Sequence, residues 1–226
     1  MSQLFFDFFA EVKSEARESD FIISQENELV YSALRNFCSQ KDFSSSNLQS
    51  VVIQGAKSSG KTELLRKILT EFSAEFLQKD DLVAVNLLQL FSANHFYILE
   101  DIDCIDDDNL LLHVINSAAE AKAFLILSTT SLQEFSLKDL VSRLKNITIL
   151  TIKNPESDLM KMLMVKELAK LQITLKGEFI DNIVKNITRN YQAIFMAVKF
   201  LEMELASVGK GVDDELVKKV IKFINA

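Results

Sequence analysis

Residues 55–62 read Gly55-Ala56-Lys57-Ser58-Ser59-Gly60-Lys61-Thr62. The stretch matches the phosphate-binding pattern G-x-x-x-x-G-K-[ST] and follows a β-branched run at Ser50–Gln54. The glycines let backbone N–H groups turn toward phosphate oxygens, and the helix expected from Thr62 presents its positive end to the same anion. We expect Lys61 to reach the β- and γ-phosphates and the Thr62 hydroxyl to bind Mg²⁺. A chance glycine-lysine turn is the alternative, but the strand before the stretch and the helix after it favour a phosphate-binding site.

Outward from this loop, short apolar runs alternate with segments of helical spacing. Strands are predicted at residues 50–54, 82–86, 96–101, 123–128 and 147–152. Helices are predicted at residues 26–37, 62–76, 109–121 and 137–144. Strands that alternate with helices indicate an α/β core, in which a parallel sheet is flanked by helices.

The pattern changes after Pro155, the single proline of the chain. Only helices are predicted beyond it, at residues 156–171, 176–186, 190–208 and 213–224. The sequence therefore predicts a flexible N-terminal tail at residues 1–19, an α/β nucleotide-binding core at 20–154 and a small all-helical lid at 155–226.

Carboxylates follow the apolar run Tyr97-Ile98-Leu99, where Glu100 and Asp101 end the predicted strand. Phosphoryl transfer needs one carboxylate to hold the metal and usually another group to orient the attacking water. We assign the metal to Glu100 and the water to Asp101, in the reverse of the usual Asp-Glu order. Since small misplacements are costly in such chemistry, we expect good nucleotide binding and slow hydrolysis. Thr130, after the next strand, is a candidate sensor of the γ-phosphate, or else a structural end-cap.

Composition and charge narrow the class of protein. The chain has 226 residues, 48% of them hydrophobic, which is enough for a sizeable core. Its formal net charge of −7 disfavours broad nucleic-acid binding. No apolar run reaches the ~18–20 residues of a membrane span, and Asp7 and Glu11 interrupt the apolar N-terminus. We therefore expect a cytoplasmic protein without a membrane partner.

These features together resemble the AAA+ ATPases, and most closely the DnaA-related branch with its Hda-type regulators. Phe21-Ile22-Ile23 resembles the entry segment that borders the adenine, which assigns Phe21 and Ile22 to nucleotide binding. Residues 137–144 resemble the segment that carries the arginine finger, at Arg143. Residues 190–195 resemble the lid helix that carries the sensor 2 arginine, at Gln192. The resemblance implies a P-loop AAA+ core with a helical lid.

Two departures from that family pattern bear on hydrolysis. The sensor 2 position holds the uncharged Gln192, and Arg189 lies one helical turn earlier. Hydroxyl residues stand where DnaA has an acidic sensor 1. Together with the Glu100-Asp101 order, they predict weak or absent intrinsic ATPase activity alongside intact nucleotide binding.

The N-terminal residues Gln3-Leu4-Phe5-Phe6-Asp7-Phe8 look like a sliding-clamp-binding peptide. An extended peptide can place Leu4, Phe6 and Phe8 in an apolar groove while the Gln3 amide makes directed hydrogen bonds. Exposed phenylalanines would otherwise favour aggregation, which is a reason to expect a partner. The alternative is that the tail packs against this chain's own fold.

The resemblance implies a negative regulator of replication initiation. Tethered to the DNA polymerase sliding clamp, it would present Arg143 to the ATP form of DnaA and stimulate hydrolysis there, while its own nucleotide is structural. An ordinary surface arginine, paired with Asp139, is the alternative for Arg143. The resemblance also allows a homo-oligomer and predicts no sequence-specific DNA binding. The other functions considered are a self-sufficient ATPase, such as a helicase-loader-like protein, and a truncated DnaA-like initiator.

Overall fold

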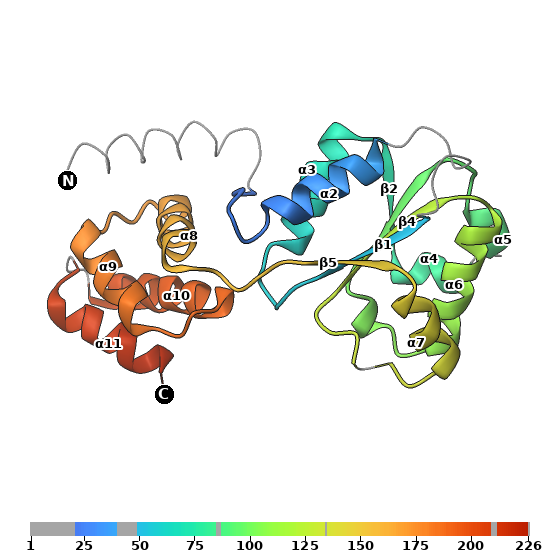
Figure 1. The fold of residues 1–226 in the computed structure, drawn as a ribbon. Helices are drawn as coiled ribbons and strands as arrows, with labels where there is room; N and C mark the ends of the chain where they lie inside the picture. Colours follow the sequence, from blue (N-terminus) through green and yellow to red (C-terminus); the bar gives the residue numbers. More distant parts are fainter. Residues whose placement is uncertain (1–20, 40–48, 85–86, 134, 209–211, 226) are drawn as a thin grey trace. The chain divides into compact units, whose positions relative to one another are not determined.

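The computed structural model describes residues 21–39, 49–84, 87–133, 135–208 and 212–225. The chain divides into two compact units, shown in Figure 1. One unit is Asn27–Lys153, and the other combines residues 21–26 with residues 154–225. The predicted clamp-binding residues Gln3, Leu4, Phe6 and Phe8 lie outside the described residues.

A parallel sheet forms the centre of the first unit. Its five strands lie in the order β2-β3-β4-β1-β5, and all neighbouring strands are parallel. The strands are β1 (Ser50–Gln54), β2 (Ala74–Leu77), β3 (Phe96–Leu99), β4 (Phe124–Thr129) and β5 (Thr148–Thr151). Because every strand runs the same way, the segments that follow the strands gather at one edge of the sheet. The predicted fold class is confirmed.

Helices cover both faces of this sheet (Figure 1). They are α2 (Glu28–Cys38), α3 (Lys61–Glu71), α4 (Lys79–Ala84), α5 (Leu87–Leu90), α6 (Asp108–Glu120) and α7 (Lys138–Lys145), with a 3-10 turn, η2 (Ile102–Cys104). On the α2 side, the Phe37 ring meets Phe96 and Phe124 edge-on, with ring centroids 5.7 Å apart in each pair. On the α6 and α7 side, buried Leu111, Val114, Leu140 and Leu144 join one apolar cluster with strand residues. Burial on both faces explains the nearly continuous apolar composition of β3 and β4.

The structure differs from the predictions at the end of one core helix and at one core strand. The helix predicted at residues 62–76 ends at Glu71, and residues 74–77 form β2. Residues 82–84, predicted as strand, belong to the helix α4. Strand pairing decides the first case, because β2 pairs along its length with β3, from Ala74 opposite Phe96 to Leu77 opposite Leu99. Local spacing carries no information about such a partner.

The second unit is built mainly from helices: α8 (Ser157–Lys170), α9 (Gly177–Asn186), α10 (Tyr191–Val208) and α11 (Asp214–Ile224). Helix α10 packs against α8 and α11, and α9 packs against the same two helices. Asp213 caps α11, since its carboxylate accepts a hydrogen bond from the Leu216 N–H at 2.9 Å. Residues 21–26 join this unit through Glu26, whose carboxylate accepts a hydrogen bond from the Glu156 N–H at 3.0 Å.

The helices that the structure describes include none that is both long enough and apolar enough to cross a membrane.

Candidate nucleotide-binding site

The loop between β1 and α3 has the backbone geometry that its glycines predict. Gly60 has φ 86° and Ser58 has φ 66°, so the chain turns through left-handed conformations before α3 begins at Lys61. At Gly55 the chain approaches closely, because a Cβ there would lie 2.6 Å from Ser59 Oγ and 3.2 Å from Ile152 Cβ. Such a loop brings backbone N–H groups and the positive end of α3 to one place.

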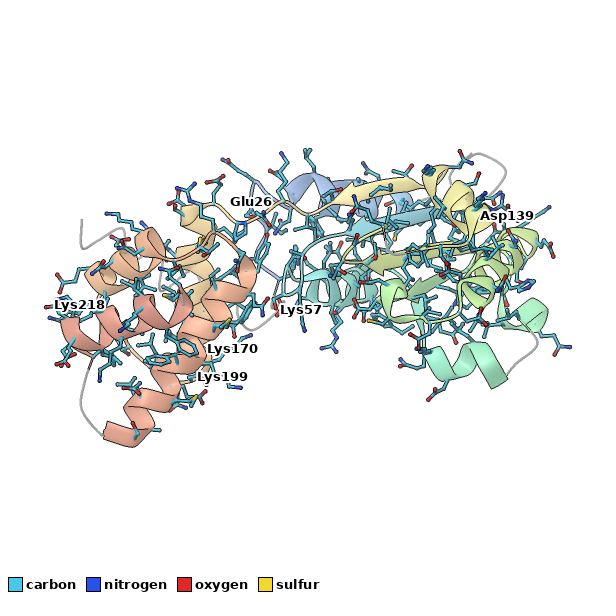
Figure 2. All side chains as sticks on the ribbon, turned by 90° about the horizontal axis from the view of Figure 1, so that it is seen from below. Glu26, Lys57, Asp139, Lys170, Lys199 and Lys218 are labelled. Carbon is cyan, nitrogen blue, oxygen red and sulfur yellow. The ribbon has the colours of Figure 1, made fainter. Side chains whose placement is uncertain are left out.

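Lys61 is the buried cation of this loop, with 7% of the residue exposed. Its Nζ donates hydrogen bonds to the carbonyl oxygens of Gly55 at 2.9 Å and Ala56 at 3.4 Å. The adjacent Thr62 is half-buried in the first turn of α3. Lys57, by contrast, is exposed on the same loop (Figure 2). The two lysines therefore differ in burial although they are four residues apart.

Hydrogen bonds connect this loop to the ends of the neighbouring strands. The Gly55 N–H donates to the Thr129 carbonyl oxygen at 3.1 Å, at the end of β4. The Asp101 N–H donates to Ser128 Oγ at 3.0 Å, which joins the end of β4 to the segment after β3. The carboxylates and hydroxyls assigned from the sequence are thus brought to the same edge of the sheet as the loop.

Two buried side-chain oxygens at this edge have no hydrogen-bond partner among the described residues: Ser59 Oγ and Glu100 Oε1. An unpaired buried acceptor is costly, and a carboxylate oxygen is a ligand that Mg²⁺ prefers. The residues present therefore fit a nucleotide with its metal, with Glu100 and Thr62 as the groups that would hold the cation. Asp101, just beyond Glu100, is exposed and has φ 47°.

Asp103 is a residue of this edge that the sequence analysis missed. Its carboxylate accepts hydrogen bonds from the Thr130 hydroxyl and from the Thr130 N–H, the latter at 3.3 Å to each oxygen. Burial acts to raise the pKa of Asp103, but hydrogen bonds, first from the Thr130 side chain, outweigh it and lower the pKa below its ordinary value. Thr130, the candidate γ-phosphate sensor, is thus held by Asp103 of η2. Its part in sensing the γ-phosphate stays a prediction.

We expect Asp103→Asn to remove a pH-dependent contribution to stability. Because the folded-state pKa of Asp103 lies below its ordinary value, the unfolded chain binds the proton more readily. The contribution is fully present above about pH 4 and is lost as the pH falls through the lowered folded pKa. In urea titrations, the free energies of unfolding of wild type and variant should differ at neutral pH and converge in acid. A gap that stays constant with pH would contradict this role.

Arg143 lies near the end of α7 and is exposed. Its Nε and Nη2 both donate to Asn116 Oδ1 on α6, at 3.1 Å and 2.8 Å. The pairing with Asp139 considered above is therefore replaced by a contact with Asn116. Asp139 itself is exposed on α7, as labelled in Figure 2.

The other residues assigned to the nucleotide belong to the helical unit. Phe21 is buried, Ile22 is half-buried, and Gln192 is exposed in the first turn of α10. Arg189, the candidate substitute for a sensor 2 arginine, forms an ion pair with Glu156 at 3.1 Å. Their part in nucleotide binding stays a prediction.

Comparisons of the sequence with protein families and with curated proteins give no match. Solved structures do match. Domain III of the replication initiation protein DnaA from Thermotoga maritima superposes with a TM-score of 0.69 at 17% identity, covering 90% of this chain and 94% of that one. The RuvB Holliday junction branch migration motor from Thermotoga maritima gives a TM-score of 0.63 at 19% identity, with coverage of 90% and 70%.

AMPPCP-bound DnaA from Aquifex aeolicus is also similar in structure, with a TM-score of 0.62 at 17% identity. The match covers 82% of this chain and 64% of that one. These similarities show that this chain shares its fold with domain III of DnaA and with RuvB.

Proposed function

We propose that this protein binds ADP or ATP with Mg²⁺ at residues 55–62. The loop geometry carries this proposal, because buried Lys61, left-handed Gly60 and the close approach at Gly55 form a phosphate cradle at the start of α3. Bound Mg²⁺ would neutralise phosphate charge, with Thr62 and Glu100 as its protein ligands. The AMPPCP-bound DnaA from Aquifex aeolicus, which shares the fold, supports the same ligand class.

The protein acts on the nucleotide of another AAA+ protein, and DnaA in its ATP form is the proposed partner. The observation behind this step is Arg143, a cation held at an exposed position near the end of α7. An arginine supplied by a neighbouring molecule stabilises the charge that develops on the transferred phosphoryl group. In this scheme the protein is an activator of hydrolysis in trans and a negative regulator of replication initiation.

The N-terminal residues Gln3, Leu4, Phe6 and Phe8 tether this regulator to the sliding clamp. Their apolar side chains suit a groove, and the Gln3 amide supplies directed hydrogen bonds. The tether raises the local concentration of Arg143 wherever clamps are loaded. Stimulation of ATP hydrolysis on DnaA would therefore occur mainly while replication is under way and clamps are loaded.

A second candidate is a self-sufficient ATPase. It is favoured by Glu100 Oε1, a buried acceptor without a partner among the described residues, at the position expected for a metal-binding carboxylate. Turnover of ATP by the isolated protein discriminates between the two functions. A regulator in trans shows little turnover of its own, whereas a motor or loader hydrolyses ATP steadily.

The clamp-tethering step is tested by calorimetry with purified sliding clamp. We expect wild-type protein to bind in the micromolar range or tighter, and a Gln3→Ala/Leu4→Ala double variant to show no binding. The reason is that the double change removes both the directed amide contact and an apolar anchor. The matched control is Glu11→Ala, a change outside residues 3–8 that should leave the affinity within about 3-fold. If wild-type protein does not bind the clamp, the tethering step is wrong, and the protein is a nucleotide-binding protein with another partner.

A further inference from the structure

Helices α6 and α7 lie side by side (Figure 1) and are tied together near both ends of α7. At the start of α7, Asp108 accepts three hydrogen bonds: from the Ser136 N–H at 2.8 Å, the Ser136 hydroxyl at 3.0 Å and the Leu137 N–H at 2.8 Å. These bonds fix the chain just before α7 begins. They also lower the pKa of Asp108, and the hydrogen bond from the Leu137 N–H contributes most.

Near the other end of α7, Asn116 of α6 holds the Arg143 guanidinium. Asn116 is half-buried, between buried Ile115 and Ser117. Its Oδ1 accepts from Nε at 3.1 Å and from Nη2 at 2.8 Å, so it occupies the Nε edge of the guanidinium. Nη1, at the opposite end of the planar group, makes no hydrogen bond to any residue that the structure describes, so its donors remain for another acceptor.

We propose that Asn116 is a positioning residue for Arg143, setting the direction in which the free end of the guanidinium meets a partner's phosphates. The inference rests on the proposed function of Arg143 as an activator in trans. A long arginine side chain loses much rotamer freedom when it is fixed in one geometry. The Asn116 contact fixes it before the partner arrives, so less freedom is lost in the transition state.

Asp108 gives this contact a defined geometry. Its hydrogen bonds from Ser136 and Leu137 tie the start of α7 to α6 at a second place, apart from the contact between Asn116 and Arg143. The neighbouring Asn146 offers a matched comparison. It lines the same surface hollow of about 330 Å³ as Asn116 and Arg143. Its Nδ2, however, donates to the Ser142 carbonyl oxygen at 3.1 Å, within its own helical turn.

The experiment measures hydrolysis of DnaA-bound ATP as a function of the concentration of full-length wild-type protein, Asn116→Ala, Asn116→Gln, Asn146→Ala and Arg143→Ala. We expect Asn116→Ala to lower the maximal stimulated rate about 3- to 10-fold while the half-saturating concentration stays unchanged. Asn116→Gln keeps an amide oxygen and should restore most of the rate. Asn146→Ala should behave like wild type. Circular dichroism and thermal unfolding check that each variant is folded.

Four outcomes would overturn the inference. A wild-type rate for Asn116→Ala, with Arg143→Ala inactive, would show that Arg143 works without its Asn116 contact and would leave the proposed function standing. A higher rate for Asn116→Ala would mean that Asn116 restrains Arg143. Equal losses for Asn116→Ala and Asn146→Ala would assign the effect to the surface as a whole. If Arg143→Ala itself stimulates like wild type, the proposed function fails as well.

Discussion

Arg143→Ala is expected to reduce the stimulated hydrolysis of DnaA-bound ATP by about 10³-fold, to the basal rate of DnaA alone. The reason is that a guanidinium placed against the transferred phosphoryl group neutralises charge in a site from which water is largely excluded. Arg143 is exposed, and the hydrogen bonds that hold it go to Asn116, so its removal leaves the sheet core intact. The variant should therefore keep its fold and its own nucleotide affinity.

Lys145→Ala is the matched control for this prediction. Lys145 is an exposed cation on the same helix, two residues further along the chain. Its removal changes the net charge by the same amount. The stimulated rate of ATP hydrolysis on DnaA should stay within about 2-fold, since a surface charge that does not contact the partner's phosphates is screened by salt. Equal losses for Lys145→Ala and Arg143→Ala would contradict a specific role for Arg143 and indicate general electrostatic attraction.

Lys61→Ala is expected to weaken the binding of ADP and ATP by about 100-fold, measured by calorimetry. Charge-assisted hydrogen bonds to phosphate are among the stronger interactions that a side chain offers, and Lys61 is the buried cation of the loop. Without its ammonium group, the anion is held mainly by backbone N–H groups and the helix terminus.

The Lys57→Ala variant serves as the control, because the Lys57 side chain is exposed and residue 57 would serve the loop through its backbone N–H, which the change keeps. Its affinity for nucleotide should stay within about 3-fold of wild type. Thermal unfolding without nucleotide separates lost binding from lost stability, since Lys61 also bonds to Gly55 and Ala56 carbonyl oxygens. A folded Lys61→Ala protein with wild-type affinity would show that residues 55–62 are not the phosphate site.

The sequence is most informative where function demands special backbone geometry. The glycines of residues 55–62 predict a turn of the backbone, and in the structure Gly60 has φ 86° while the chain approaches Gly55 closely. Buried strands such as β3 and β4 can also be recognised from the sequence, because both faces of a parallel sheet need apolar side chains. The cap at Asp213 follows from local chemistry alone.

Other features depend on partners that are distant in the chain. Residues 74–77 form a strand because they pair with β3. The local sequence of residues 74–77 does not indicate this pairing. Asp103 lies among several acidic residues, and the bonds that single it out come from Thr130, 27 residues away. The same separation of 27 residues joins Asn116 to Arg143. Polar contacts across such gaps carry no periodicity, so sequence patterns do not reveal them.

A hydrolysis assay with labelled ATP confined to DnaA tests most directly whether this protein acts on another protein's nucleotide. DnaA is loaded with labelled ATP, this protein is supplied with unlabelled nucleotide, and clamp loaded on DNA is added. We predict that the label on DnaA is converted to ADP much faster than on DnaA alone, and that Arg143→Ala abolishes the difference. An unchanged rate on DnaA, with steady turnover of the unlabelled ATP, would contradict the proposed function and favour a self-sufficient ATPase.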